Sequence, residues 1–191
     1  MPGEERREEN AYVLDFLSTG KFASGRAEPL AQLLGDEWFT LLEVVPKPGV
    51  ALKQEEKVYI GKEERDKIAL IKSRITFMEL TQNAKTELPR IVGMIVKEKE
   101  PHFVDVFNKA GPLNIREHSL ELLPGVGKKH LDAILKARNE KPFESFSDIS
   151  ARVPLMQDPA KLITDRIIDE LQGTGRFYMF TKPYVKREGR Y

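Results

Sequence analysis

The chain has no cysteine, one tryptophan and three histidines. Without cysteine the protein forms no disulfide bond, and thiolate zinc sites are excluded. His102, His118 and His130 are isolated along the sequence, so no histidine cluster for a metal is expected. We therefore expect no metal centre and no cofactor. A chain without cysteine also fits a reducing compartment, and the expected location is cytoplasmic.

Long apolar runs are missing as well. No stretch approaches the roughly 18 apolar residues that a membrane-crossing helix needs. Residues 1–10, MPGEERREEN, are polar and lack the apolar segment of a secretory signal, so we expect them to be frayed. The sequence therefore predicts no membrane partner.

An excess of charge of one sign is also absent. The 31 Lys and Arg residues nearly balance 30 Asp and Glu residues, which gives a net charge of +1. Charged residues make up 32% of the chain, against about 25% in ordinary globular proteins. Overall charge therefore does not identify a nucleic-acid-binding protein, and any attraction to phosphate must come from a local patch.

Apolar and β-branched runs separated by turn residues predict strands in the N-terminal part. The expected strands are residues 11–17, 30–34, 38–45 and 57–61. Short strands spaced by Gly and Pro turns suggest a small OB-type or SH3-like β-barrel over residues 1–62. The overall fold class is then α+β, with an all-α domain in the C-terminal half.

The apolar period changes after residue 62, and residues 63–111 are expected to form a helical connection. Ile68, Ile71 and Ile75 recur at i, i+3 and i+7, which predicts one face of a helix. Residues 84–95 repeat apolar positions in the manner of a long amphipathic helix, and Pro101 is placed to open the next helix.

Residues 112–174 contain two expected helix–turn–helix units. In the first, Asn114 is a plausible N-cap for a short helix before the sequence PGVG, and a second helix follows. Residues 146–172 form the second unit, which lacks the G-x-G pattern. Residues 175–191 are expected to hold a strand, at 176–181, that returns to the barrel, followed by a basic tail.

The sequence Leu-Pro-Gly-Val-Gly-Lys-Lys at residues 123–129 is suited to binding phosphate. Backbone N–H groups at a helix N-terminus are unpaired, and the helix dipole favours an anion there. Gly125 and Gly127 remove side chains that would block a ligand. Lys128 and Lys129 oppose the dipole, at a cost of up to about 1 kcal/mol each, and an anionic partner would resolve that conflict.

Residues 114–138 resemble the helix-hairpin-helix family of DNA- and RNA-binding modules, and the whole of 112–174 resembles a tandem helix-hairpin-helix domain. The resemblance implies that N–H groups of the hairpin contact successive phosphates. It also implies a possible monovalent cation at the carbonyls of Glu121, Leu123 and Val126. The predicted nucleic-acid-binding residues are Pro124, Gly125, Val126, Gly127, Lys128, Lys129 and His130. A tight packing turn with no ligand is the alternative.

The last 16 residues are a second candidate surface, because basic and aromatic residues occur together there. Such a mixture suits single strands, whose bases stack on rings while their phosphates meet cations. The alternatives are a solvated tail and aromatic side chains that only cover the core. The candidates are Arg176, Lys182, Tyr184, Lys186, Arg187 and Arg190.

Nearly the whole chain resembles the archaeal domain of unknown function family 655. The resemblance is carried by residues 63–89, by residues 107–153 and by the closing RFYMF at 176–180. It implies binding of RNA or another nucleic acid, with a barrel beside helix-hairpin-helix units, and it implies no reaction.

These patterns favour a non-catalytic, largely sequence-independent protein that binds the RNA or DNA backbone, with RNA slightly favoured. No P-loop, H-E-x-x-H sequence or other catalytic motif occurs. Two alternatives remain: a protein-interaction scaffold with unknown protein partners, and an accessory or catalytic component of DNA repair or RNA processing.

Overall fold

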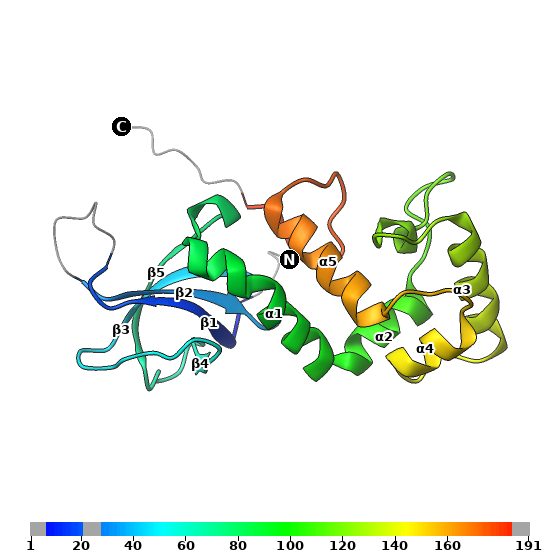
Figure 1. Ribbon diagram of the computed structural model, residues 1–191. Helices are drawn as coiled ribbons and strands as arrows, with labels where there is room; N and C mark the ends of the chain where they lie inside the picture. Colours follow the sequence, from blue (N-terminus) through cyan, green and yellow to red (C-terminus); the bar gives the residue numbers. More distant parts are fainter. Residues whose placement is uncertain (1–6, 21–27, 185–191) are drawn as a thin grey trace, which may run out of the picture. The chain divides into compact units, whose positions relative to one another are not determined.

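The computed structural model describes residues 7–20 and 28–184, and these residues form an α+β protein (Figure 1). The chain divides into two compact units. The first, here the sheet unit, contains residues 1–91, 170–174 and 180–191. The second, here the helical unit, contains residues 92–169 and 175–179. The helical unit is therefore inserted, in the order of the chain, into the sheet unit.

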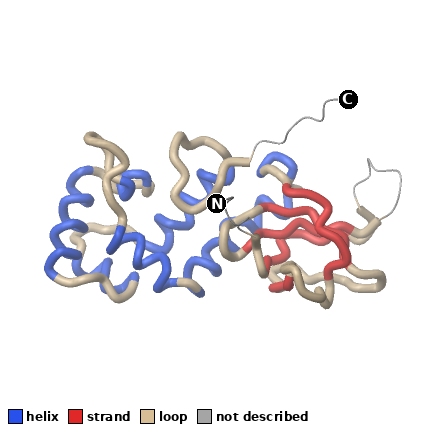
Figure 2. The backbone as a smooth tube through the Cα atoms, turned by 180° about the vertical axis from the view of Figure 1, so that it is seen from behind, coloured by secondary structure: helices blue, strands red, loops and turns tan. Residues whose placement is uncertain are grey.

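The sheet unit is built on five antiparallel strands in the order β4-β1-β2-β3-β5. Figure 2 shows the strands in red. The sheet is curled into a half-barrel. Within the described ranges no ladder joins β4 to β5, so these two strands are its edges. The strands are β1 (Asn10–Leu17), β2 (Leu30–Gly35), β3 (Leu41–Pro46), β4 (Lys57–Tyr59) and β5 (Ile68–Arg74).

The core of this sheet comes from small and branched apolar side chains. β2 is buried along its whole length, as expected of a central strand. A cluster of fully or almost fully buried residues holds the strands together, and it contains Ala11, Val13, Ala31, Leu33, Leu42, Val44, Leu52, Val58, Ile60 and Ile68.

The prediction of a helix from the spacing of Ile68, Ile71 and Ile75 is wrong, because residues Ile68–Arg74 form strand β5. The register against β3 shifts twice, so that Ala69 and Lys72 are extra residues on β5. A bulge turns the following side chain to the other face of a strand. Ile68 and Ile71 therefore both face the core at a spacing of three, which imitates a helix.

The strand expected at residues 38–45 begins later, at Leu41. The carboxylate of Glu8 accepts hydrogen bonds from the backbone N–H groups of Glu37 (2.9 Å), Trp38 (3.0 Å) and Thr40 (3.0 Å). Glu8 is only 6% exposed, so the expectation that residues 1–10 are frayed is wrong at this position. A Cβ on Gly35 would lie 2.0 Å from Cδ of Glu8, which explains glycine there.

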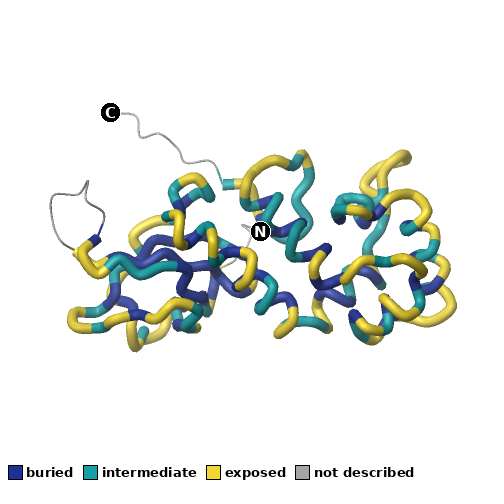
Figure 3. The backbone as a smooth tube through the Cα atoms, viewed as in Figure 1, coloured by how far each residue is buried: buried dark blue, intermediate teal, exposed yellow. Residues whose placement is uncertain are grey.

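Five α-helices follow the sheet, and the amphipathic and capping signals predicted most of them. They are α1 (Gln82–Glu98), α2 (Glu100–Lys109), α3 (Lys128–Glu140), α4 (Phe146–Arg152) and α5 (Pro159–Gln172). The described residues also contain two short 3-10 turns, η2 (Phe77–Glu79) and η3 (Ser119–Leu122). The buried faces of the helices are dark in Figure 3. No helix in the described part of the chain has the length and apolar character needed to cross a membrane.

The strand expected at residues 176–181 does not form. α5 ends at Gln172, the next residue is Gly173, whose φ of +75° suits glycine, and residues 174–184 have no regular secondary structure. The buried carboxylate of Glu170 accepts hydrogen bonds from the N–H groups of Phe180 (3.0 Å) and Thr181 (2.8 Å). These contacts satisfy backbone groups that a neighbouring strand would otherwise satisfy.

Candidate nucleic-acid interface

The residues predicted to contact phosphate lie in the helical unit, between η3 and α3. The first helix of the expected hairpin is shortened to the single turn η3, and its N-cap is His118 rather than Asn114. Nδ1 of His118 accepts the N–H of Leu120 at 3.1 Å. Asn114 instead closes an earlier turn, where Oδ1 accepts the N–H groups of Arg116 (2.8 Å) and Glu117 (3.0 Å).

The imidazole of His118 serves as a hydrogen-bond acceptor only while Nδ1 is unprotonated. Burial lowers the pKa of His118, and the charge of Arg138 lowers it further, whereas Glu121 raises it. The net lowering keeps the imidazole neutral and favours the cap.

The turn between η3 and α3, here the glycine turn, consists of residues 123–127. Gly125 has a φ of +85°, which side-chain-bearing residues rarely adopt. The N–H of Val126 donates to the carbonyl of Leu123 at 3.0 Å. The side chains of Leu123 and Val126 are buried, at 1% and 5% exposed, so they fix the turn to the core.

Gly127 is the N-cap of α3, and its local structure does not require glycine. Its φ of −95° and ψ of −177° are extended backbone that any residue adopts. A Cβ at this position would meet nothing within 4 Å. Serine, threonine, asparagine and aspartate are the preferred N-caps, because their side chains bond the free N–H groups of the first turn. Glycine has no side chain that could bond these N–H groups.

The backbone N–H groups around Gly127 point out of the hairpin without protein partners. Within the described residues, the N–H groups of Gly125, Gly127, Lys128, Lys129 and His130 donate to no acceptor. The first bond that enters the helix runs from the N–H of Leu131 to the carbonyl of Gly127, at 2.9 Å. Several donors thus converge at the positive end of a helix of 13 residues, an arrangement that suits an anion.

The two lysines of the first turn are placed differently. Nζ of Lys128 lies 2.9 Å from a carboxylate oxygen of Glu121 and 3.2 Å from the carbonyl of Arg116. The bond from Lys128, together with the N–H of His118, lowers the pKa of Glu121. Lys129 is exposed, and no described side chain pairs with it. The unfavourable charge inferred from sequence is thus compensated at Lys128 and remains at Lys129. His130 is half-buried.

The carbonyls expected to hold a monovalent cation remain a prediction. Leu123 already uses its carbonyl to accept the N–H of Val126. Across residues 7–20 and 28–184, no group of three or more His, Asp and Glu side chains is arranged to hold a metal ion.

The second helix–turn–helix unit is α4 and α5, and its turn has different chemistry. Oγ of Ser145 accepts the N–H of Asp148 at 3.0 Å, so Ser145 is the N-cap of α4. At the start of α5, Oδ1 of Asp158 accepts the N–H of Ala160 at 2.9 Å. A carboxylate thus already occupies the end of α5 where an anion would bind.

Arg152 is a residue that the sequence did not single out. Its guanidinium donates to the carbonyls of Ala137 and Lys141 at the end of α3, and it pairs with Asp148 at 3.0 Å. It also lies 4.8 Å from the ring centre of Phe143. Arg152 therefore joins the end of the α3 helix to α4, and only the three-dimensional structure reveals this role.

The described candidates of the C-terminal surface fall in different units. Arg176 is exposed and lies 5.3 Å from the ring centre of Phe177, in the helical unit. Lys182 and Tyr184 belong to the sheet unit, where Arg74 donates to the carbonyl of Lys182 at 2.9 Å and lies 4.7 Å from the ring centre of Tyr184. Lys186, Arg187 and Arg190 lie outside the described residues.

Comparison with known proteins matches residues 7–182 to the family described as "Protein of unknown function (DUF655)". An uncharacterized protein from Methanocaldococcus jannaschii, MJ0038, is 40% identical over 180 residues, which cover 93% of this chain and 82% of the relative. The crystal structure of Af1531 from Archaeoglobus fulgidus shares 46% identity at a TM-score of 0.85, covering 92% of this chain and all of that one. A family match over this length, together with these relatives, shows that the chain belongs to the DUF655 family.

Proposed function

We propose that this protein is a non-catalytic nucleic-acid-binding protein whose helical unit contacts the phosphate backbone as a helix-hairpin-helix module. The observation that carries the proposal is the glycine at position 127. Its backbone is unstrained and its surroundings are open, so the protein's own packing does not explain the missing side chain. An external anion bound to the free N–H groups of the first turn does explain it.

Two further observations support a phosphate at this position. The exposed ammonium group of Lys129 stands in the first turn of α3, where an anion would offset its repulsion by the helix dipole. The equivalent turn before α5 carries Asp158 instead, which fits a single phosphate-binding turn in a tandem domain. Contacts of N–H groups with phosphate read no bases, so binding would be largely independent of sequence.

RNA remains slightly favoured over DNA in this proposal. The proposal treats the half-barrel as an OB-type or SH3-like fold, which together with the basic and aromatic residues at the C-terminal end of the sequence would suit single strands or structured RNA. The sheet unit and the C-terminal residues would then add contacts to those of the glycine turn.

A second candidate function is protein interaction through the helical unit. Ile115 and Leu155 are fully or almost fully exposed, at 105% and 93%, and Leu113 is 39% exposed. Exposed apolar side chains often mark a surface that binds another protein. In that case the glycine turn would be only a tight connection between helices.

The sharpest test is Gly127→Asp. Aspartate is a preferred N-cap, so the variant should keep or slightly raise the free energy of unfolding. Its carboxylate would take the free N–H groups and repel phosphate. We expect affinity for fluorescein-labelled RNA and DNA, measured by anisotropy, to fall at least about tenfold, equal to about 1.4 kcal/mol.

The matched control is Asn139→Asp, which makes the same change of charge at an exposed position near the other end of α3. It should leave nucleic-acid affinity within about twofold of the original, a difference of less than 1 kcal/mol. Equal affinity of Gly127→Asp and the unmodified protein would remove the glycine turn from the binding site and favour the interaction scaffold.

A further inference from the structure

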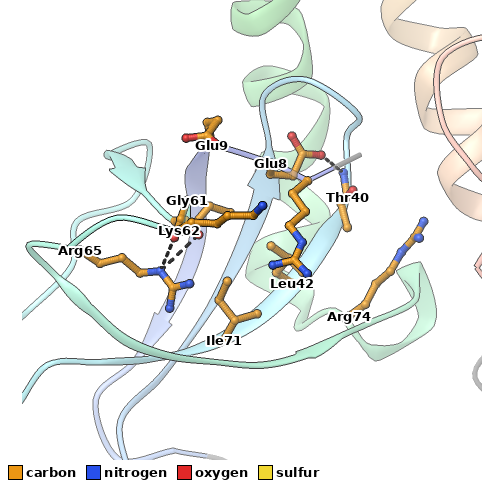
Figure 4. A pocket seen from close by; sticks show the side chains of 11 residues that line it. Glu8, Glu9, Thr40, Leu42, Gly61, Lys62, Arg65, Ile71 and Arg74 are labelled. Atoms are coloured by element: carbon orange, nitrogen blue, oxygen red, sulfur yellow. Dashed lines mark hydrogen bonds between the residues drawn. The ribbon is translucent and has the colours of Figure 1, made fainter. Parts of the chain in front are cut away.

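The sheet unit contains a pocket of about 320 Å³ on the side of the sheet that carries Leu42 and Ile71 (Figure 4). The volume lies at the lower end of the range of small-molecule sites, about 300–1,000 Å³. Its basic side chains come from the segment before β1, the loop after β4 and the end of β5, and they are Arg7, Lys62, Arg65 and Arg74. We call this site the basic pocket.

The acidic side chains of the pocket compensate little of this charge. The lining holds four basic and two acidic residues, a local balance of +2. Glu8 is one of the two acids, and its carboxylate accepts hydrogen bonds from three backbone N–H groups of the turn before β3. Glu9 is the other acid, and it is exposed to solvent.

The guanidinium group of Arg65 is oriented before any ligand binds. Nε of Arg65 donates to the carbonyls of Gly61 at 2.9 Å and Ile60 at 3.2 Å, which fixes the plane of its guanidinium (Figure 4). Lys62 extends across the pocket in the same view, and no side chain in the described part of the chain pairs with it. A preoriented guanidinium and a mobile ammonium group are a common pair for phosphate.

Arg74 adds an unsatisfied donor. Its Nη2 bonds the carbonyl of Lys182, but its Nε is buried and has no hydrogen-bond partner. Burial lowers the pKa of this guanidinium, whereas Tyr184 and Glu8 raise it. A buried donor without a partner costs about 1–3 kcal/mol, and an anion bound in the pocket would reduce the cost of keeping this charge away from water.

The pocket also has an apolar lining, made by Leu42, Ile60 and Ile71. A bare anion would leave this surface in contact with water, whereas a ligand with a flat, weakly polar body would cover it. Guanidinium groups also stack on aromatic rings. We propose that the basic pocket binds a nucleotide, with its phosphate among the basic side chains and its base against the apolar lining.

This inference does not rest on the glycine turn, which lies in the other unit. The nucleotide has two possible sources, a free mononucleotide and the phosphorylated end of a nucleic-acid strand. Both present the same phosphate and base to the pocket, and the experiment below separates them.

The test is a titration of the full chain with adenosine monophosphate, followed by ¹H–¹⁵N NMR. Adenosine and inorganic phosphate are titrated in parallel. We expect the amide of Gly61 and the Nε–H signals of Arg65 and Arg74 to shift in a saturable manner. The monophosphate should bind at least about tenfold more tightly than adenosine or phosphate, since each of these makes only part of the contacts.

Lys62→Glu should weaken binding of the monophosphate at least about tenfold, the effect of losing one charge-assisted hydrogen bond. The control is Lys97→Glu, which makes the same change of charge at an exposed position of α1. Lys62→Met is the second variant, because it removes the charge and keeps much of the side-chain length. The NMR spectra report whether each variant is folded.

The source of the nucleotide is decided with the Gly127→Asp variant, in which the glycine turn no longer contributes. An RNA hexamer with a 5′-phosphate that binds more tightly than adenosine monophosphate assigns the pocket to strand ends. A hexamer that binds more weakly assigns it to free nucleotides. Gly127→Asp itself should leave the affinity for adenosine monophosphate unchanged, because the glycine turn is not part of the basic pocket. The two proposals can therefore fail independently of each other.

Three results would overturn the proposal. One is inorganic phosphate binding as tightly as the monophosphate, which would leave a simple anion site. Another is an unchanged affinity in both Lys62 variants. The last is the absence of any saturable shift at Gly61, Arg65 and Arg74 with monophosphate at millimolar concentration.

Discussion

Side chains that accept hydrogen bonds from backbone N–H groups organise several irregular parts of this protein. Glu8 holds the turn before β3, His118 caps η3, and Glu170 holds the chain after α5. In each place the backbone N–H groups have no carbonyl partner within a helix or strand ladder, and the side chain supplies the acceptor that they need. Substitutions at single residues should therefore have local and separable effects.

Lys129 is predicted to be a phosphate contact rather than a structural residue. Lys129→Ala should weaken nucleic-acid binding several-fold and reduce the slope of log affinity against log salt concentration by about 1, because one cation is removed. The urea midpoint should stay the same or rise slightly, since the side chain is exposed and its charge opposes the dipole of α3. Anisotropy at several salt concentrations measures both quantities.

Lys136→Ala serves as the control for Lys129, because Lys136 is exposed on the same helix. We expect a smaller loss of affinity for this variant. Equal losses for the two variants would indicate general electrostatic attraction along α3 instead of a site at its N-terminus.

His118 should make stability depend on pH. Its pKa in the folded protein is lowered, so its contribution is present above the ordinary histidine pKa of about 6.5 and is lost as the pH falls through the lowered value. His118→Asn keeps a capping oxygen and removes this titration. Between about pH 7.5 and pH 5.5, on either side of the ordinary value, the urea midpoint should fall more for the unmodified protein than for the variant.

The residues that the sequence could identify are those whose role depends on near neighbours. Gly125 and Gly127 stand out because a turn and a helix start lie within a few residues of them. Glu8 and Arg152 could not be recognised, because their partners are brought close only by the fold. The basic pocket was missed for the same reason, since its four basic residues come from separate segments.

At the scale of elements, the spacing of apolar residues and the capping residues predicted most of the helices and the central strands. They failed at β5, where the bulge at Ala69 gives Ile68 and Ile71 a helical spacing. They also failed at residues 176–181, where an aromatic run typical of a strand is held by side chains instead of a ladder. A single sequence does not show which other segment will satisfy a backbone donor.

Glu170 is predicted to hold the segment that follows α5. Glu170→Ala would leave the buried N–H groups of Phe180 and Thr181 without their acceptor, at a cost of about 1–3 kcal/mol. We expect faster hydrogen exchange at both amides and faster tryptic cleavage after Lys182. Glu170→Gln keeps one acceptor oxygen and should show a smaller effect. Unchanged exchange in Glu170→Ala would mean that other contacts hold this segment.

For the whole molecule, the balance of charges limits how nucleic acid is attracted. The net charge of +1 provides little long-range steering, so binding depends on a few close contacts. We therefore expect the slope of log affinity against log salt concentration to lie near −2 to −4, as a few phosphate contacts would give. Anisotropy with single- and double-stranded RNA and DNA measures the slope and also identifies the preferred ligand. A slope near zero would contradict backbone recognition.

The hydrogen bond between Arg74 and the carbonyl of Lys182 spans 108 positions of the chain. During synthesis on the ribosome, all five strands are made before the helical unit, whereas Lys182 is made after it. Arg74, at the edge of the nascent sheet, therefore lacks this partner until the helical unit has been translated. The sheet unit is thus completed only after the helical unit has been made. Translation products that stop before Lys182 should be cleaved by proteases preferentially near β5.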